Sequence, residues 1–264
     1  MRFSIITVVW NDRDGLRRTA DSVRGQTIAD YEWLVLDGSS SDGTVDLLET
    51  WTRDEALRWW SEVDGGIYDA MNKGIARARG DYLVFLNAGD EFAGPATLES
   101  VREVVDGSAE VVDFLYGDAV DIGLDGTERY RIARDHECLW WTMFACHQAM
   151  YFRRQTVGQL RYDLDLGTSA DYGFLARFLR PADSRISVNV KRFSGPLCRF
   201  WLGGISWKNR ERALLNDFRI RRRHLGVSAP VGAALYVAHL VHTWLKRNVP
   251  SLTQKARYSP LPPD

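Results

Sequence analysis

The sequence has little cysteine, and the three thiols are not arranged for metal binding or cross-linking. Cys138, Cys146 and Cys198 are spread over a chain of 264 residues, and no Cys-x-x-Cys pair occurs. An odd number of widely spaced thiols indicates neither a zinc site nor a disulfide framework. We therefore expect reduced thiols in a cytoplasmic protein.

The chain also lacks a long apolar run, a targeting segment and a strong net charge. No apolar stretch reaches the roughly 18 residues that a membrane-spanning helix needs, and the N-terminus opens on a strand-like run instead of a signal peptide. The formal net charge of −1 gives no reason to expect nucleic acid as a partner. Hydrophobic residues make up 45% of the chain and charged residues 26%, as in globular proteins that bury a core.

The common nucleotide-binding motifs are absent as well. No Gly-x-Gly-x-x-Gly follows the first strand-like run, and no Walker loop is present. Dinucleotide-binding and P-loop proteins are therefore poor matches.

Over the first 90 residues, apolar runs of strand length alternate with helical patterns. Strands are predicted at 3–9, 31–36, 57–61 and 82–86, and helices at 14–24, at 66–78 and from Asp42. This alternation predicts an α/β fold with parallel strands and right-handed crossovers. The second half is less regular, with predicted strands at 111–116, 127–132, 147–152 and 185–190, a helix at 171–179, and a helical region from residue 205.

Polar residues gather where loops follow the predicted strands. These segments are 10–12, 37–44, 64–74 and 87–90. Each alone also fits a turn or a helix cap. Together they converge on the carboxyl edge of one sheet, where α/β proteins bind ligands. In the last segment a carboxylate beside a flexible glycine suits a hard cation that carries a diphosphate.

Taken in order, these segments resemble family 2 glycosyltransferases with the GT-A fold, and most closely the bacterial subgroup of the colanic-acid type, which makes exopolysaccharide, O-antigen or glycolipid sugars. The resemblance rests on VVWNDRDGLRRTADSVRGQT, LVLDGSSSDGT, EVDGGIYDAMNKGIARARGDYLVFLNAGDEF, CHQAMYFRR, SADYGFLARF and FWLGGIS. It implies a Rossmann-like, mostly parallel central sheet flanked by helices. The implied catalytic domain covers 1–204, with a nucleotide-sugar-binding half at 1–118 and an acceptor-binding half at 119–204, and a helical, basic tail follows at 205–264.

The resemblance also implies roles for individual residues. Asp171 matches the family's catalytic base, and Asp90 matches the carboxylate that binds Mg²⁺ or Mn²⁺. The implied donor-binding residues are Thr7, Trp10, Asn11, Asp37, Asp69, Asn72, Lys73, Asn87, Ala88 and Gly89. The implied contacts to the acceptor or the diphosphate are His147, Gln148 and Trp201. The sequence departs from the family pattern at three positions, because Asn87 and Gly89 replace usual aspartates and Ala170 replaces a usual glutamate.

The implied activity is an inverting transfer of a sugar from a UDP-, GDP- or dTDP-sugar to a sugar-containing, lipid-linked or secondary-metabolite acceptor. Such a transfer needs a base for the acceptor hydroxyl and a cation for the departing diphosphate. Two alternatives stay open. One is a nucleotidyltransferase that makes sugar nucleotides, although the glycine-rich basic loop typical of that class is absent. The other is a non-catalytic protein that binds a sugar or a partner.

The tail is basic and has an amphipathic pattern. Arg219 and Arg221–Arg223 form a basic cluster, and a helix from Pro230 would carry one apolar face, made of Val231, Ala234, Leu235, Ala238, Val241 and Leu245. This pattern fits peripheral docking on the anionic inner face of the cell membrane. It fits equally a helix packed on the catalytic domain or on the partner subunit of a homo-oligomer.

Overall fold

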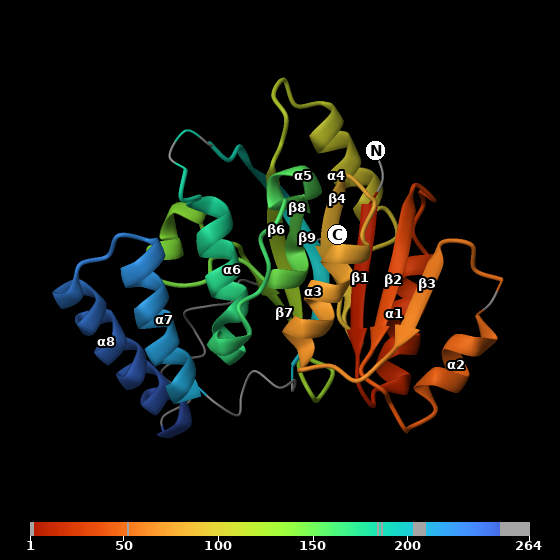
Figure 1. The fold of residues 1–264 in the computed structure, drawn as a ribbon, viewed down its shortest axis with the longest axis horizontal. Coiled ribbons are helices and arrows are strands. Elements are labelled where there is room, and N and C mark those ends of the chain that lie inside the picture. The colour runs from red at the N-terminus through yellow and green to blue at the C-terminus, as the bar shows by residue number, and fades with distance from the viewer. Residues whose placement is uncertain (1–2, 52, 184, 186, 203–209, 249–264) are drawn as a thin grey trace.

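A mixed sheet of nine strands forms the centre of the molecule (Figure 1). The computed structural model describes residues 3–51, 53–183, 185, 187–202 and 210–248. The first four strands pair in parallel in the order β3-β2-β1-β4; they are β1 (Phe3–Val9), β2 (Tyr31–Asp37), β3 (Leu57–Ser61) and β4 (Tyr82–Phe85).

The sheet continues without a break into the second half of the chain. Beyond β4 the order is β8 (Met150–Arg153), β6 (Phe114–Ile122), β9 (Val190–Trp201) and β5 (Glu91–Phe92), and β7 (Glu128–Arg131) pairs with β6. Strand β8 runs antiparallel to both β4 and β6, whereas β6 and β9 are parallel. The two predicted halves of the catalytic domain therefore share one hydrogen-bonded sheet.

Helices cover both faces of the sheet (Figure 1). They are α1 (Arg13–Arg24), α2 (Thr44–Thr50), α3 (Ile67–Arg77), α4 (Thr97–Asp106), α5 (Arg154–Val157), α6 (Ala170–Leu179), α7 (Arg210–His224) and α8 (Ala229–Asn248). Three short 3₁₀ helices are η1 (His136–Trp140), η2 (His147–Ala149) and η3 (Leu164–Ser169).

Strand β1 shows why the sequence folds in this way. All seven of its residues are buried. Ile6 and Val8 join a core that includes residues of α3 and α6, whereas Phe3, Ile5 and Val9 join a second core that includes residues of α1 and α4. A strand buried on both faces reads as a continuous apolar run, which is the pattern that predicted this strand.

In the second half of the chain the structure differs from three predicted strands. The strand predicted at 111–116 is β6, which begins at Phe114 and extends to Ile122; the strand predicted at 185–190 is β9, which begins only at Val190. The segment predicted as a strand at 147–152 starts as the 3₁₀ turn η2. Buried charged residues interrupt the apolar pattern of β6, and β9 contains Pro196, which lies at a register irregularity opposite Asp118.

The described part of the tail is helical, as predicted, and helix α7 packs on α6 and η3 while α8 packs on α7. The basic cluster is not a single exposed patch. Arg221 is 1% exposed and donates to the backbone oxygen of Trp141 at 2.6 Å, whereas Arg219, Arg222 and Arg223 are exposed. Residues 205–209 and 249–264 of the predicted tail lie outside the described residues. Within the part that is described, no helix has both the length and the apolar character needed to cross a membrane.

The close packing of α3 on the sheet gives a stability prediction. A Cβ at Gly74 would lie 2.5 Å from Ile6 Cγ2 and 3.3 Å from Leu36 Cδ2. We expect Gly74→Ala to lower the free energy of unfolding by about 1–3 kcal/mol through overpacking, although alanine favours a helix by about 1 kcal/mol. Denaturant unfolding measures this. Gly94→Ala is the control, because a Cβ there meets nothing within 4 Å. Equal stability of the two variants would contradict the packing argument.

Candidate functional site

The parallel strands end along one edge of the sheet, and Asp37 is the buried carboxylate at that edge. It pairs in register with Val9 of β1 and Ser61 of β3. Its Oδ2 accepts hydrogen bonds from Ser61 Oγ at 2.6 Å and from the backbone N–H of Ser40 at 3.0 Å. Asp37 is 1% exposed, and its Oδ1 has no hydrogen-bond partner in the described structure. An unpaired buried oxygen is unfavourable, so an N–H or O–H donor of a ligand that reached Oδ1 would stabilise it.

An exposed indole lies beside this carboxylate. Trp10 follows β1 directly and is 66% exposed. A Cβ at Gly38, the residue after Asp37, would lie 3.4 Å from Trp10 Cδ1 and 3.0 Å from Asp64 Oδ2. The backbone of Gly38 is thus bordered by the indole of Trp10 and by a second carboxylate. An exposed indole and carboxylates together suit a flat heterocyclic ring with N–H groups.

Asn11 joins the loops that follow β1 and β2. Its backbone N–H donates to Ser40 Oγ at 2.7 Å, and its Oδ1 accepts from the backbone N–H of Ser41 at 2.8 Å. The backbone of Asn11 has a φ of 49°, a conformation that asparagine tolerates better than most residues. In this structure the predicted donor-binding amide therefore holds the rim of the site together.

The segment 87–90 extends β4 at the same edge and is fixed to α1. Ala88 N–H donates to the backbone oxygen of Val8 at 3.1 Å, and Gly89 N–H donates to Thr19 Oγ1 at 3.1 Å. Gly89 has a φ of +94°, which residues with a side chain rarely adopt. Asn87 Oδ1 is buried and has no hydrogen-bond partner among the described residues. It is the second unsatisfied oxygen at this edge.

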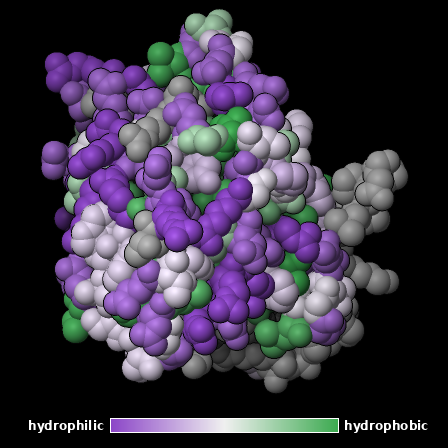
Figure 2. Space-filling model, turned by 90° about the vertical axis from the view of Figure 1, so that its right-hand side faces the viewer, coloured by the Kyte–Doolittle hydropathy of each residue, from purple (hydrophilic) through white to green (hydrophobic). Residues whose placement is uncertain are grey.

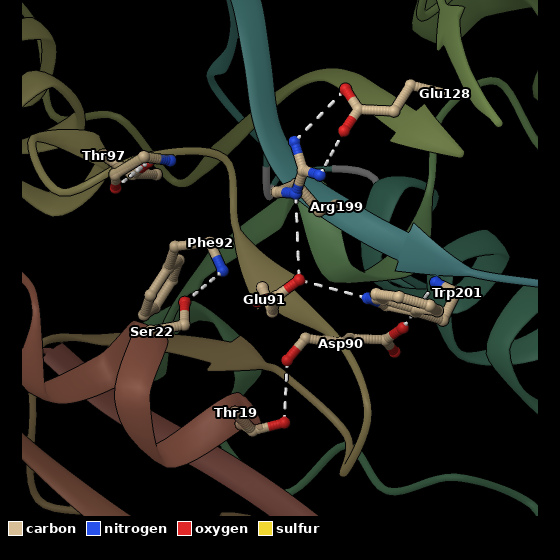
Figure 3. A network of polar contacts seen from close by, with 10 residues as sticks. Thr19, Ser22, Asp90, Glu91, Phe92, Thr97, Glu128, Arg199 and Trp201 are labelled. Atoms are coloured by element: carbon tan, nitrogen blue, oxygen red, sulfur yellow. Dashed lines mark hydrogen bonds and ion pairs between the residues drawn. The ribbon is translucent and has the colours of Figure 1, made fainter. Parts of the chain in front are cut away.

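Asp90 connects three distant segments, and two of its partners, Thr19 and Trp201, lie beside it in Figure 3. Its Oδ1 accepts from the backbone N–H of Trp201 at 3.1 Å, its Oδ2 accepts from Gln148 Nε2 at 2.9 Å, and its backbone oxygen accepts from Thr19 Oγ1 at 2.7 Å. The side chain is 5% exposed. Burial raises the pKa of Asp90 well above its usual range, although the two hydrogen bonds oppose this shift.

Glu91, the residue that follows Asp90, holds the indole of Trp201. Trp201 Nε1 donates to Glu91 Oε2 at 3.1 Å, and Glu91 also pairs with Arg199 at 3.7 Å (Figure 3). The guanidinium of Arg18 lies over the indole, 4.7 Å from the ring centroid. The end of β9 is therefore bound to the 87–90 segment by side chains as well as backbone.

These contacts do not fit the predicted role of Asp90 as a ligand of Mg²⁺ or Mn²⁺. Both carboxylate oxygens already accept hydrogen bonds from protein donors. Asn87 and Gly89 supply no further carboxylate. Among the residues that the structure describes, no group of three or more His, Cys, Asp or Glu side chains is placed to hold a metal ion.

Helix α3 contributes Asn72, which binds the backbone of a distant residue, and the cation Lys73. Asn72 donates from Nδ2 to the backbone oxygen of Tyr162 at 2.9 Å and accepts at Oδ1 from the backbone N–H of Tyr162 at 2.7 Å. Both ends of this predicted donor-binding amide are thus used within the protein. Lys73 Nζ lies 3.4 Å from Asp69 Oδ2 and 3.5 Å from Glu62 Oε1 and remains partly exposed. Lys73 and Asp69 are thus both partly exposed charged groups of α3.

His147 and Gln148 are both engaged inside the protein. His147 Nε2 lies 2.8 Å from the hydroxyl of Tyr162, and its ring packs 5.1 Å from that of Phe85. Burial lowers the pKa of His147 to about 4, so the ring is neutral near pH 7. Gln148 accepts from Cys146 Sγ at 3.1 Å while it donates to Asp90.

Asp171 lies in the first turn of α6, and two tyrosines lie near it. Burial, with a further contribution from the Asp171 carboxylate, raises the pKa of both Tyr68 and Tyr162 well above the usual range. The two tyrosine rings are 5.3 Å apart. Sequence reasoning did not single out either tyrosine. Tyr68 lies within the conspicuous 64–74 segment, whereas nothing in the local sequence marks Tyr162.

The structure therefore places predicted site residues around two centres, and Thr7 lies at neither of them. Trp10, Asp37 and the 87–89 segment lie along one edge, while His147 and Asp171 lie around Tyr162. Thr7 is fully buried in β1, and its Oγ1 accepts from Trp33 Nε1 at 2.9 Å, so the core leaves it no surface for a donor.

Comparisons with known proteins indicate the family of this chain. A family model described as "Glycosyl transferase family 2" matches residues 4–161. An uncharacterized glycosyltransferase of Mycobacterium tuberculosis is 37% identical over 220 residues, which cover 82% of this chain and 81% of the relative.

Two solved structures share the fold. The S. aureus protein TarS (residues 1–349, in complex with UDP-GlcNAc) has a TM-score of 0.68 at 15% identity, over 97% of this chain and 77% of TarS. The mannosyltransferase PcManGT from Pyrobaculum calidifontis, in complex with GDP-Man and Mn²⁺, has a TM-score of 0.63 at 16% identity, over 95% of this chain and 82% of PcManGT. At these identities the likeness establishes the fold, which is of the GT-A type.

The Asp90–Gln148 pair gives a prediction that separates positioning from metal binding. In Asp90→Asn the amide faces the donor group of Gln148, and we expect a loss of about 1–3 kcal/mol in the free energy of unfolding. Adding Gln148→Glu reverses the polarity of the pair and restores one donor and one acceptor. The double variant should recover most of the lost stability, as measured by denaturant unfolding.

The same variants test whether Asp90 is a metal ligand. If Asp90 holds its segment in place, Mn²⁺ changes the nucleotide affinity of the double variant as much as it changes that of the unaltered protein. A double variant with recovered stability but no response to Mn²⁺ would instead identify Asp90 as a metal ligand. Isothermal titration with UDP and GDP, with and without Mn²⁺, distinguishes the two outcomes.

Proposed function

This chain belongs to glycosyl transferase family 2, and we propose that it is an inverting hexosyltransferase that moves a sugar from a nucleotide-diphosphate sugar to a hydroxyl group. The proposed acceptor is a glycan, a lipid-linked molecule or a secondary metabolite. The proposed place of the reaction is the cytoplasm, at the inner face of the cell membrane.

The observation that carries this proposal is the unpaired oxygen of Asp37 beside the exposed ring of Trp10. A pyrimidine base such as uracil or thymine, or a guanine, presents a ring N–H that can donate to this oxygen while its face packs on an indole. The second unpaired oxygen, Asn87 Oδ1, lies after β4, which is separated from β2 by β1 in the sheet, and is suited to a ribose hydroxyl. Two unsatisfied acceptors at one edge support a nucleoside ligand better than an unsubstituted sugar.

Asp171 is the proposed base for the acceptor hydroxyl. In an inverting transfer the acceptor oxygen attacks the anomeric carbon on the face opposite the diphosphate. The acceptor O–H proton passes to the carboxylate of Asp171 as the new C–O bond forms, and the bond to the diphosphate oxygen breaks. The nucleoside diphosphate leaves with the electron pair. This reaction needs one carboxylate and no covalent intermediate.

We propose that side chains of this protein stabilise the negative charge of the leaving diphosphate. His147 is neutral near pH 7 because burial lowers its pKa to about 4, so it contributes no positive charge. Lys73 is the cation that we propose to face the diphosphate, held in place by Asp69 at 3.4 Å. A divalent cation is present in the Mn²⁺ complex of PcManGT, and a requirement for one stays a prediction for this chain. No step is assigned to it, because Asp90 does not fit the role of its ligand.

Removing the carboxylate of Asp37 should weaken donor binding more than it slows the reaction. We expect Asp37→Ala to raise the KM for the nucleotide sugar about 10- to 100-fold, as for the loss of a hydrogen bond to a charged group. The kcat should change little, because the lost contact is uniform in the ground and transition states. Steady-state kinetics with UDP-, GDP- and dTDP-sugars measures both constants. Asp46→Ala removes an exposed carboxylate of α2 as the control. A change in kcat alone would argue against base recognition by Asp37.

Removing the proton-accepting capacity of Asp171 should abolish transfer but preserve donor binding. Asp171→Asn keeps the size of the side chain, and we expect transfer to fall about 10²- to 10⁴-fold, with nucleotide affinity unchanged. The product anomer, determined by NMR, should be inverted relative to the donor. Asp165→Asn is the control, since Asp165 is an exposed carboxylate in the preceding turn. Near-normal transfer in Asp171→Asn, or a retained anomer, would exclude the assignment.

A further inference from the structure

Helix α8 lies at one end of the molecule (Figure 1), and several of its apolar side chains are exposed to solvent. Val231, Val237 and Val241 are between 46% and 56% exposed, and Ala234 and Ala238 are exposed as well. At 3.6 residues per turn these five side chains lie on one side of the helix. They form a stripe about 15 Å long.

The opposite side of α8 is already occupied. Gly232 lies against α7, where a Cβ would meet the ring of Phe218 at 2.9 Å. His239 Nε2 lies 3.2 Å from the backbone oxygen of Trp141. The helix is therefore anchored by its inner face, and the apolar stripe is not the face that packs on the domain.

The composition of α8 is unusual for an exposed helix. From Ala229 to Leu245 the sequence contains no Asp, Glu, Lys or Arg. A surface helix of a globular protein ordinarily carries charged residues on its outer face. At the other end of the molecule, the side of β3 and α2, the surface is largely hydrophilic with scattered apolar residues (Figure 2). An exposed apolar stripe thus marks an interaction surface.

The charge of this region indicates what covers the stripe. Between Phe218 and Pro263 the sequence has eight Lys or Arg residues and no Asp or Glu. Exposed arginines at Arg219, Arg222 and Arg223 precede α8, and Lys246 and Arg247 follow the stripe. Each basic residue near an anionic bilayer adds about 1 kcal/mol of attraction. A second copy of the chain would bring the same positive charge to the contact and would be repelled.

We propose that the Val231–Val241 stripe of α8 inserts into the interfacial region of a bilayer that contains anionic lipids. The valines and alanines enter the boundary between headgroups and acyl chains, and the flanking basic residues contact the headgroups. This docking deepens the proposed function, since it would hold the transferase at the surface where a lipid-linked acceptor lies. The binding itself does not depend on that function.

The test is co-sedimentation of the full chain with lipid vesicles. One set contains phosphatidylcholine alone, and the other also contains phosphatidylglycerol. The variant Val237→Gln/Val241→Gln removes apolar surface from the stripe without changing the charge. Leu124→Gln is the matched control, because Leu124 is 89% exposed in the turn between β6 and β7, away from α8. Circular dichroism and the rate of transfer to a water-soluble acceptor check that each variant is folded and active.

We expect the unaltered protein and Leu124→Gln to bind the phosphatidylglycerol vesicles at least about tenfold more strongly than the double variant, with binding that weakens as salt is added. No binding to anionic vesicles, or equal binding by the double variant, overturns the proposal. A dimer in analytical ultracentrifugation that the double variant disrupts would assign the stripe to self-association instead. If the double variant loses vesicle binding but transfers sugar to a water-soluble acceptor at an unchanged rate, membrane docking is tested independently of the proposed function.

Discussion

The parallel pairing of β2, β1 and β4 is the constraint on which the site depends. It aligns Asp37 with Val9 and Ser61 and brings the 87–90 segment beside the end of β1. The loops after these strands must then meet at one edge, where they are fastened to one another and to α1 by hydrogen bonds. A rigid edge of this kind is what a transfer reaction needs, because the donor must be held in a fixed geometry relative to the attacking hydroxyl.

Hydrogen bonding divides the polar residues of the predicted site into two classes. Asp90, Asn72 and His147 have their polar atoms engaged by protein partners and serve to hold segments together. Asp37 and Asn87 each keep one buried oxygen without a partner in the described structure. Since such oxygens are unfavourable without a partner, this difference is the reason that we propose Asp37 and Asn87 as contacts to a nucleotide. A pattern of residue types alone does not make that distinction.

The continuous sheet also explains how the two halves act as one unit. Strand β9 pairs with β6, and the backbone N–H of its last residue, Trp201, is bound by Asp90 of the first half. On the other side of the sheet, Asn72 of α3 clamps the backbone of Tyr162, which lies near Asp171. The candidate donor and acceptor sides are thus joined by two independent connections. Of the tail helices, α7 packs on α6 and η3, whereas α8 packs on α7 and carries its apolar stripe on the outer side.

The sequence by itself determined the first half of the fold, the family and the edge at which the polar loops meet. These follow from local patterns, because a strand buried on both faces is apolar along its length and each strand end is marked by polar and glycine residues. The tertiary structure alone decided that Thr7 is a core residue, that Asp90 is satisfied by protein donors, that two tyrosines lie near Asp171, and that β9 is a strand despite Pro196. The partners of Asp90 are 58 and 111 residues away. No local periodicity encodes such pairings, since they arise only when the sheet brings distant segments together.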